Sequence, residues 1–79
     1  MNIEQDFYDV LQDYIDFPVS ELNTGLPLNY AAAMSSFTYI QLISALEAQF
    51  SLRIPNEDLP ELRSAGDLLA YLQRRLSGR

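Results

Sequence analysis

The sequence predicts an all-α protein: a small antiparallel four-helix bundle of three main helices and one short helix, with a long first loop. Three observations support this prediction. Apolar residues recur at the spacing of one helix face in three segments, and no segment keeps the alternation of a strand. The 79 residues also include no cysteine, so the fold depends on one apolar core without disulfides. We expect residues 1–79 to form a single domain.

The first helix is predicted over residues 3–16, and Pro18 is expected to end it. Its apolar face consists of Ile3, Phe7, Val10, Leu11 and Tyr14. Four aspartates line the opposite side: Asp6, Asp9, Asp13 and Asp16. Their spacing fits a solvated face or a metal cluster. We favour the solvated face, because calcium sites normally wrap the ion with loop oxygens as well.

Residues 17–35 are predicted as a loop, because prolines, a glycine and asparagines interrupt every helical pattern there. Four apolar side chains are expected to attach this loop to the core: Leu22, Leu26, Leu28 and Tyr30. A connection of this length is unusual in a compact domain, and such loops are often functional.

The second main helix is predicted over residues 36–50. Its core face consists of Tyr39, Leu42, Ile43, Leu46 and Phe50. Phe37 and Ile40 fall off this face and are expected to be exposed. Two exposed apolar side chains beside the pair Ser35 and Ser36 indicate a contact surface. Either serine could cap the helix by accepting a backbone N–H.

The short helix is predicted within residues 56–62, with Asn56 as its cap and Pro60 limiting its length. Just before it, Ile54 is expected to point into the core.

The last helix is predicted to start at Ser64, which is spaced as a capping box with Asp67. Its apolar face consists of Leu68, Leu69, Leu72 and Leu76. Arg74 and Arg75 suit the negative end of the helix dipole, and Gly78 is predicted as a stop signal.

Composition excludes several classes of function. The net charge is −6, and residues 1–30 hold six acidic and no basic residues, so nucleic-acid binding is disfavoured and a basic protein partner is favoured. The chain has no histidine, cysteine or lysine, which removes catalytic triads, Schiff-base chemistry and nearly all zinc sites. Carboxylate pairs remain possible, but a helical chain this small has little room for a catalytic cleft. Neither a membrane span nor a signal peptide is visible, so we expect a cytoplasmic protein.

Residues 35–59, SSFTYIQLISALEAQFSLRIPNEDL, resemble the acyl carrier protein and peptidyl carrier protein superfamily. In that family an Asp-Ser-Leu motif opens a helix that ends in a segment like ALEEEFGIEIPDED. Residues 45–58 match this segment at Ala45, Leu46, Glu47, Phe50, Ile54, Pro55, Glu57 and Asp58. SAGDLLAYL (64–72) is similar to the family's TVGDVVDYI. Counting back from Phe50 and Ile54 places the family's modified serine at Ser36.

The resemblance implies that residues 1–79 are a carrier-protein domain and not an enzyme. Ser36 would receive a 4′-phosphopantetheine arm from coenzyme A through a separate phosphopantetheinyl transferase. The thiol of the arm would then hold an acyl or aminoacyl group as a thioester for loading and tailoring enzymes. The partner-contact residues implied are Ser35, Phe37, Ile40, Gln41, Ser44 and Glu47. We expect a free-standing monomer without metal, nucleic-acid or membrane partners.

The attachment motif departs from the family pattern. Ser35 stands where the family has aspartate, Ala33 replaces a glycine, and Phe37 replaces leucine. Transferases commonly engage that aspartate, so the alternative hypothesis is an unmodified carrier-like protein that acts as an interaction module. In the carrier hypothesis Ser35 caps the helix and Ser36 carries the arm, because modification of Ser35 would shift the alignment with Phe50. The divergent motif favours polyketide, nonribosomal peptide or related secondary-metabolite biosynthesis.

Overall fold

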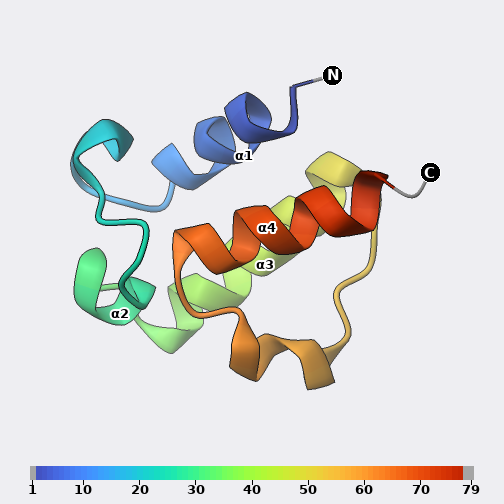
Figure 1. Ribbon diagram of the computed structural model, residues 1–79. Helices are drawn as coiled ribbons and strands as arrows, with labels where there is room; N and C mark the ends of the chain where they lie inside the picture. The colour runs from blue at the N-terminus through green and yellow to red at the C-terminus, as the bar shows by residue number, and fades with distance from the viewer. Residues whose placement is uncertain (1, 78–79) are drawn as a thin grey trace.

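The computed structural model describes residues 2–77, and its regular elements are all helices (Figure 1). Four α-helices occur in this range: α1 (Ile3–Gln12), α2 (Leu28–Ala31), α3 (Ser36–Phe50) and α4 (Ala65–Ser77). Two short 3-10 helices, η1 (Val19–Glu21) and η2 (Asn56–Glu61), lie in the connections. The predicted all-α class with three main helices is confirmed. The stop signal predicted at Gly78 lies outside the described residues.

Of the three long helices, α1 contacts both α3 and α4. In Figure 1, α1 runs opposite to α3 and α4, which both run from left to right. The connection that contains η2 returns from the end of α3 to the start of α4, so that these consecutive long helices point the same way. The fold therefore places the starts of α3 and α4 at the same end of the molecule.

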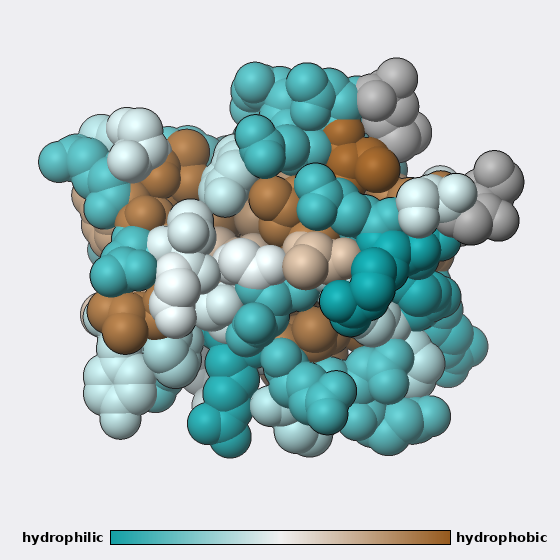
Figure 2. Space-filling model, viewed as in Figure 1, coloured by the Kyte–Doolittle hydropathy of each residue, from teal (hydrophilic) through white to brown (hydrophobic). Residues whose placement is uncertain are grey.

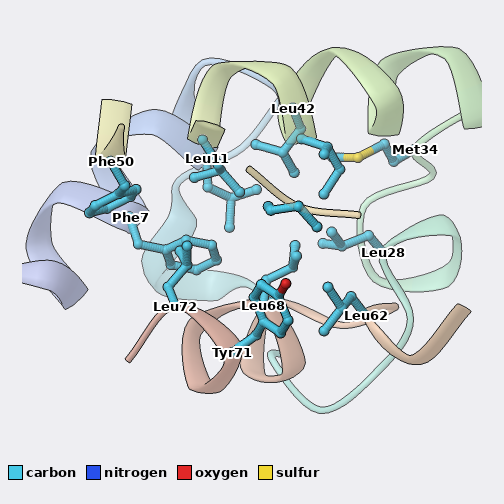
Figure 3. Packing of buried hydrophobic residues seen from close by; sticks show 14 of the residues in the cluster. Phe7, Leu11, Leu28, Met34, Leu42, Phe50, Leu62, Leu68, Tyr71 and Leu72 are labelled. Atoms are coloured by element: carbon cyan, nitrogen blue, oxygen red, sulfur yellow. The ribbon is translucent and has the colours of Figure 1, made fainter. Parts of the chain in front are cut away.

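One hydrophobic core fills the space between the long helices. Figure 3 shows Phe7, Phe50 and Leu72 meeting at one end of this core. Leu28, Met34 and Leu62, all from the connections, close the other end. The core face predicted for α3 is confirmed, with four buried residues and a half-buried Tyr39: Leu42, Ile43, Leu46 and Phe50.

The remaining predictions for the core are mostly confirmed. Ile54 is buried, as are Leu68 and Leu72 of α4, while Leu69 and Leu76 are half-buried against the core. Tyr71 is also buried, which the sequence pattern did not indicate. Its hydroxyl donates a hydrogen bond to Asp58 Oδ2 at 2.8 Å, and this bond joins α4 to η2.

Helix α1 ends four residues earlier than predicted, so the predicted end at residue 16 is wrong. The side chain of Gln12 explains the early end. Its Nε2 donates to the Phe17 carbonyl at 2.9 Å, and its Oε1 accepts the Val19 N–H at 2.8 Å. These two bonds stabilise the non-helical turn that follows α1. Pro18 comes after this turn and precedes η1.

The connection between α1 and α3 has more structure than a loop, because it contains η1 and α2. Leu22 and Leu28 are buried as predicted, but Leu26 is 45% and Tyr30 is 78% exposed, so the prediction is wrong for these two. The Leu28 N–H donates to the Arg63 carbonyl at 2.8 Å, which fixes Leu28 over the core. Within the single turn of α2, Tyr30 then points outward.

The start of η2 differs from the prediction, because Asn56 lies inside this helix and no side chain caps it. Pro55 is the preceding residue, and its carbonyl accepts the Asp58 N–H at 3.0 Å. The cap predicted for Asn56 is therefore wrong. Pro60 lies inside η2 and is followed by one more residue of this helix.

The predicted capping box of α4 is confirmed. The Asp67 N–H donates to Ser64 Oγ at 3.0 Å, and the Ser64 N–H donates to Asp67 Oδ2 at 3.2 Å. The Ser64 backbone hydrogen bond holds the pKa of Asp67 below its ordinary value. Arg74 and Arg75 lie in the last turn of α4, as predicted.

The surface facing the viewer in Figure 2 is mixed. Hydrophobic atoms appear there in small, separate groups between hydrophilic side chains. No helix within residues 2–77 combines the length and the apolar character needed to cross a membrane.

Two non-glycine residues in the described range have a positive φ, and one of them, Ala33, lies in the segment that leads to α3. Its φ is 52°, a left-handed conformation that costs a residue with a Cβ about 1–2 kcal/mol. We expect Ala33→Gly to raise the free energy of unfolding by about 0.5–1 kcal/mol, because glycine removes this strain but gains freedom in the unfolded chain. Urea denaturation of both proteins measures the difference.

The neighbouring residue provides the control for this prediction. Ala32 has a φ of −133°, so glycine relieves no left-handed strain there. Ala32→Gly should therefore lower the free energy of unfolding. A loss of stability in Ala33→Gly of the same size would contradict the strain argument.

Candidate functional site

The start of α3 gives Ser35 and Ser36 different local roles. Ser35 is the N-cap: its Oγ accepts the Thr38 N–H at 3.2 Å and donates to Thr38 Oγ1 at 3.1 Å. Ser36 is the first residue of the helix, is exposed, and its hydroxyl makes no hydrogen bond to any residue between 2 and 77. The assignment of the cap to Ser35 is confirmed. The Ser36 oxygen is free to form a bond to an incoming group.

The local charge at Ser36 suits a phosphate ester. The first turn of α3 contains no acidic residue, and the positive end of its helix dipole lies at Ser36. The backbone N–H groups of Ser36 and Phe37 have no partner within the helix, as in the first turn of any α-helix. A 4′-phosphopantetheine arm attached to this exposed oxygen would therefore place its negative charge beside unpaired donors.

The six predicted partner-contact residues all lie on or beside α3. Phe37 is 72% and Ile40 is 51% exposed, and Ser35, Gln41 and Ser44 are exposed as well. Glu47 differs, because it is half-buried and its Oε2 accepts the Ile54 N–H at 2.7 Å. One oxygen of this carboxylate therefore holds the chain that follows α3, in addition to any role at the surface.

A pocket of about 340 Å³ opens beside Ser36, at the end of the core closed by Leu28, Met34 and Leu62. Its wall also includes residues that the sequence analysis did not single out as functional: Asn29, Tyr39, Leu59 and Arg63. The hydroxyl of Tyr39 donates to the Leu62 carbonyl, and burial raises the pKa of Tyr39, so this side chain stays neutral. No local sequence signal brings these residues together, because α3 and the segment after η2 meet only in the folded chain.

A second hollow of about 430 Å³ lies on the α1 side of Ser35. Asp13 and Asp16 line it together with Ser35 and Gln41. The carboxylates of Asp13 and Asp16 thus line the same hollow as Ser35, which stands where the family has an aspartate. In residues 2–77, no three or more aspartates or glutamates are grouped closely enough to hold a metal ion.

These features define a class of protein. The start of α3 presents an exposed serine hydroxyl that forms no hydrogen bond within residues 2–77, so a group can be attached to it. The chain has no histidine or cysteine and therefore cannot form a catalytic triad. A family model described as a phosphopantetheine attachment site matches residues 5–72. The chain therefore belongs to the phosphopantetheine-binding family of acyl and peptidyl carrier proteins.

Curated relatives are similar over most of the chain. An acyl carrier protein of Chlamydia caviae is 27% identical over 75 residues, which cover 95% of this chain and 97% of the relative. An acyl carrier protein of Kineococcus radiotolerans is 37% identical over 60 residues, or 65% of this chain and 74% of the relative. An acyl carrier protein of Chlamydia felis is 28% identical over 75 residues, covering 95% and 96%.

Family membership establishes the general function. The chain is an acyl carrier and not a catalyst, and its prosthetic group is a covalently attached 4′-phosphopantetheine. Its partners are a phosphopantetheinyl transferase and enzymes that handle acyl groups.

Proposed function

We propose that Ser36 is the attachment residue and that the chain holds acyl or aminoacyl cargo as a thioester on the arm bound there. The main support is the free hydroxyl of Ser36, exposed at the first position of α3 while Ser35 satisfies the helix cap. The chain would supply the oxygen that bonds to phosphorus, while the pyrophosphate bond of coenzyme A breaks and adenosine 3′,5′-bisphosphate leaves. Without histidine, it relies on the transferase to take up the hydroxyl proton.

The surface of α3 would then be read by partner enzymes. Phe37 and Ile40 present apolar contacts, with Ser35, Gln41, Ser44 and the free oxygen of Glu47 around them. Asp13 and Asp16 would supply the negative charge that Ser35 lacks, because they line the hollow next to it. A basic patch on the transferase is the expected complement.

The divergent motif supports a further proposal, that the carrier serves polyketide, nonribosomal peptide or related secondary-metabolite biosynthesis. An aspartate could cap α3 as well as Ser35 does, so the substitution changes the charge next to Ser36 and keeps the cap. A dedicated transferase or synthase would recognise this altered charge. We propose that the chain acts there as a cytoplasmic monomer.

The loading reaction tests the attachment. The purified protein is incubated with coenzyme A and a broad-range phosphopantetheinyl transferase, and its intact mass is measured. We expect a gain of one phosphopantetheine arm per chain. If neither this enzyme nor transferases encoded near the gene add mass, the result would favour the unmodified interaction module.

A further inference from the structure

We propose that the pocket between Ser36 and Arg63 binds the phosphodiester that joins the arm to Ser36, with the Arg63 guanidinium as its counter-ion. The proposal rests on attachment at Ser36. It assigns to Arg63, which lies 27 positions later in the sequence, the role of holding the first part of the arm against the carrier.

The backbone of Arg63 is fixed at the pocket wall. Its carbonyl accepts the Leu28 N–H at 2.8 Å, and its own N–H donates to Asp67 Oδ2 at 3.3 Å. The second bond goes to the Asp67 carboxylate, which also accepts the Ser64 N–H in the capping box of α4. The Arg63 side chain therefore starts from a point fixed by two other segments.

The guanidinium of Arg63 is oriented but has no counter-ion. Its Nε donates to the Pro60 carbonyl at 3.2 Å, and its terminal N–H groups have no acceptor among residues 2–77. No carboxylate in that range pairs with it, although the chain carries 11 acidic residues. The planar group can thus offer two parallel N–H donors to phosphate oxygens.

The rest of the pocket makes Arg63 the main determinant of binding. It is the one charged residue in the lining, which contains no acid. The Tyr39 hydroxyl is already committed to the Leu62 carbonyl, so it is not available to an anion. The phosphodiester would be bonded directly to the Ser36 oxygen, which itself lines this pocket. The anion would therefore be attached at the wall of the same pocket that Arg63 lines.

The size of the pocket agrees with this occupant. A volume of about 340 Å³ is at the small end of ligand pockets, which suits a phosphodiester and the first atoms of the arm. A carboxylate at the far end of the cargo is the other anion that could reach Arg63. The test therefore includes both sources.

The experiment compares unloaded and loaded protein for the wild type, Arg63→Gln and the control Arg53→Gln. Arg53 lines a different hollow, which does not contain Ser36. Complete loading of each protein is verified first by intact mass. At low salt we expect loading to raise the Tm of the wild type by about 2–6 °C. This shift should be lost in Arg63→Gln and kept in Arg53→Gln, and high salt should reduce it.

A second readout uses the wild-type protein alone and does not depend on variant folding. Loading should shift the NMR signal of the Arg63 Nε–H, and this shift should be present while the thiol is free. If the shifts appear only when the arm carries a succinyl group, and not with a free thiol or an acetyl group, the anion is the cargo and the proposal is wrong. Loading without any response at Arg63 also overturns it. Failure of loading itself overturns the proposed function as well.

Discussion

Ser36→Ala is expected to abolish loading completely, whereas Ser35→Ala should still accept one arm. The structure gives the physical reason for this contrast. The Ser36 hydroxyl is exposed and forms no hydrogen bond within residues 2–77. The Ser35 hydroxyl accepts a hydrogen bond from the Thr38 N–H and donates one to Thr38 Oγ1. Intact mass after incubation with coenzyme A and the transferase distinguishes the two outcomes. Retention of the arm in Ser36→Ala, with loss in Ser35→Ala, would show that the alignment with Phe50 is wrong.

Folding of the two variants controls this experiment. Removal of the cap in Ser35→Ala should cost about 1 kcal/mol, and Ser36→Ala should cost less, because the Ser36 hydroxyl forms no hydrogen bond within residues 2–77. Ser35→Asp is the matched gain-of-charge variant: it keeps the cap and adds the negative charge found in the family motif. With the broad-range transferase, Ser35→Asp should load at least as fast as the wild type. Slower loading would indicate a transferase surface that rejects this charge.

Leu42→Ala is expected to lower the free energy of unfolding by about 2–5 kcal/mol. Leu42 is fully buried on α3 and points into the core formed with α1 and α4 (Figure 3). Truncation leaves a cavity, because close-packed neighbours collapse into it only in part. A domain of this size has about 4–12 kcal/mol in total, so much of its stability would be lost. Urea denaturation followed by circular dichroism measures the change.

Ile40→Ala, two residues away on the same helix, is the control. Half of its side chain is exposed, so it should change the free energy of unfolding by less than about 1 kcal/mol. Cargo transfer from the loaded variant to a partner enzyme should nevertheless become slower. A stability loss equal to that of Leu42→Ala would mean that Ile40 belongs to the core and not to a contact surface.

The residues of α3 show what the sequence could predict. Its bounds, its buried face and its two exposed apolar residues all agree with the structure, because each depends on local information. A serine cap marks the start, and a 3.6-residue period runs without interruption to Phe50. The local signal left the cap open between Ser35 and Ser36, and only the resemblance to carrier proteins, aligned on Phe50 and Ile54, gave the two serines different roles.

Errors occurred where distant groups compete with the local pattern. The end of α1 depends on the Gln12 amide binding backbone groups five and seven residues later. The burial of Leu28 rather than Tyr30 depends on a hydrogen bond to Arg63. Arg63 itself reaches the pocket beside Ser36 only because the chain returns through η2. Periodicity contains no information on such contacts.

The bond between Leu28 and Arg63 has a consequence for the dynamics of the carrier. It is reinforced by a second cross-link, because the Gly66 N–H donates to the Thr24 carbonyl at 2.9 Å. The connection that leads to Ser36 is therefore tied at two points to residues 63–66, which precede and begin α4. Local unfolding of one segment must break hydrogen bonds of the other, so that the two open as one cooperative unit. The site for the arm would then be as rigid as the docking of α4 allows.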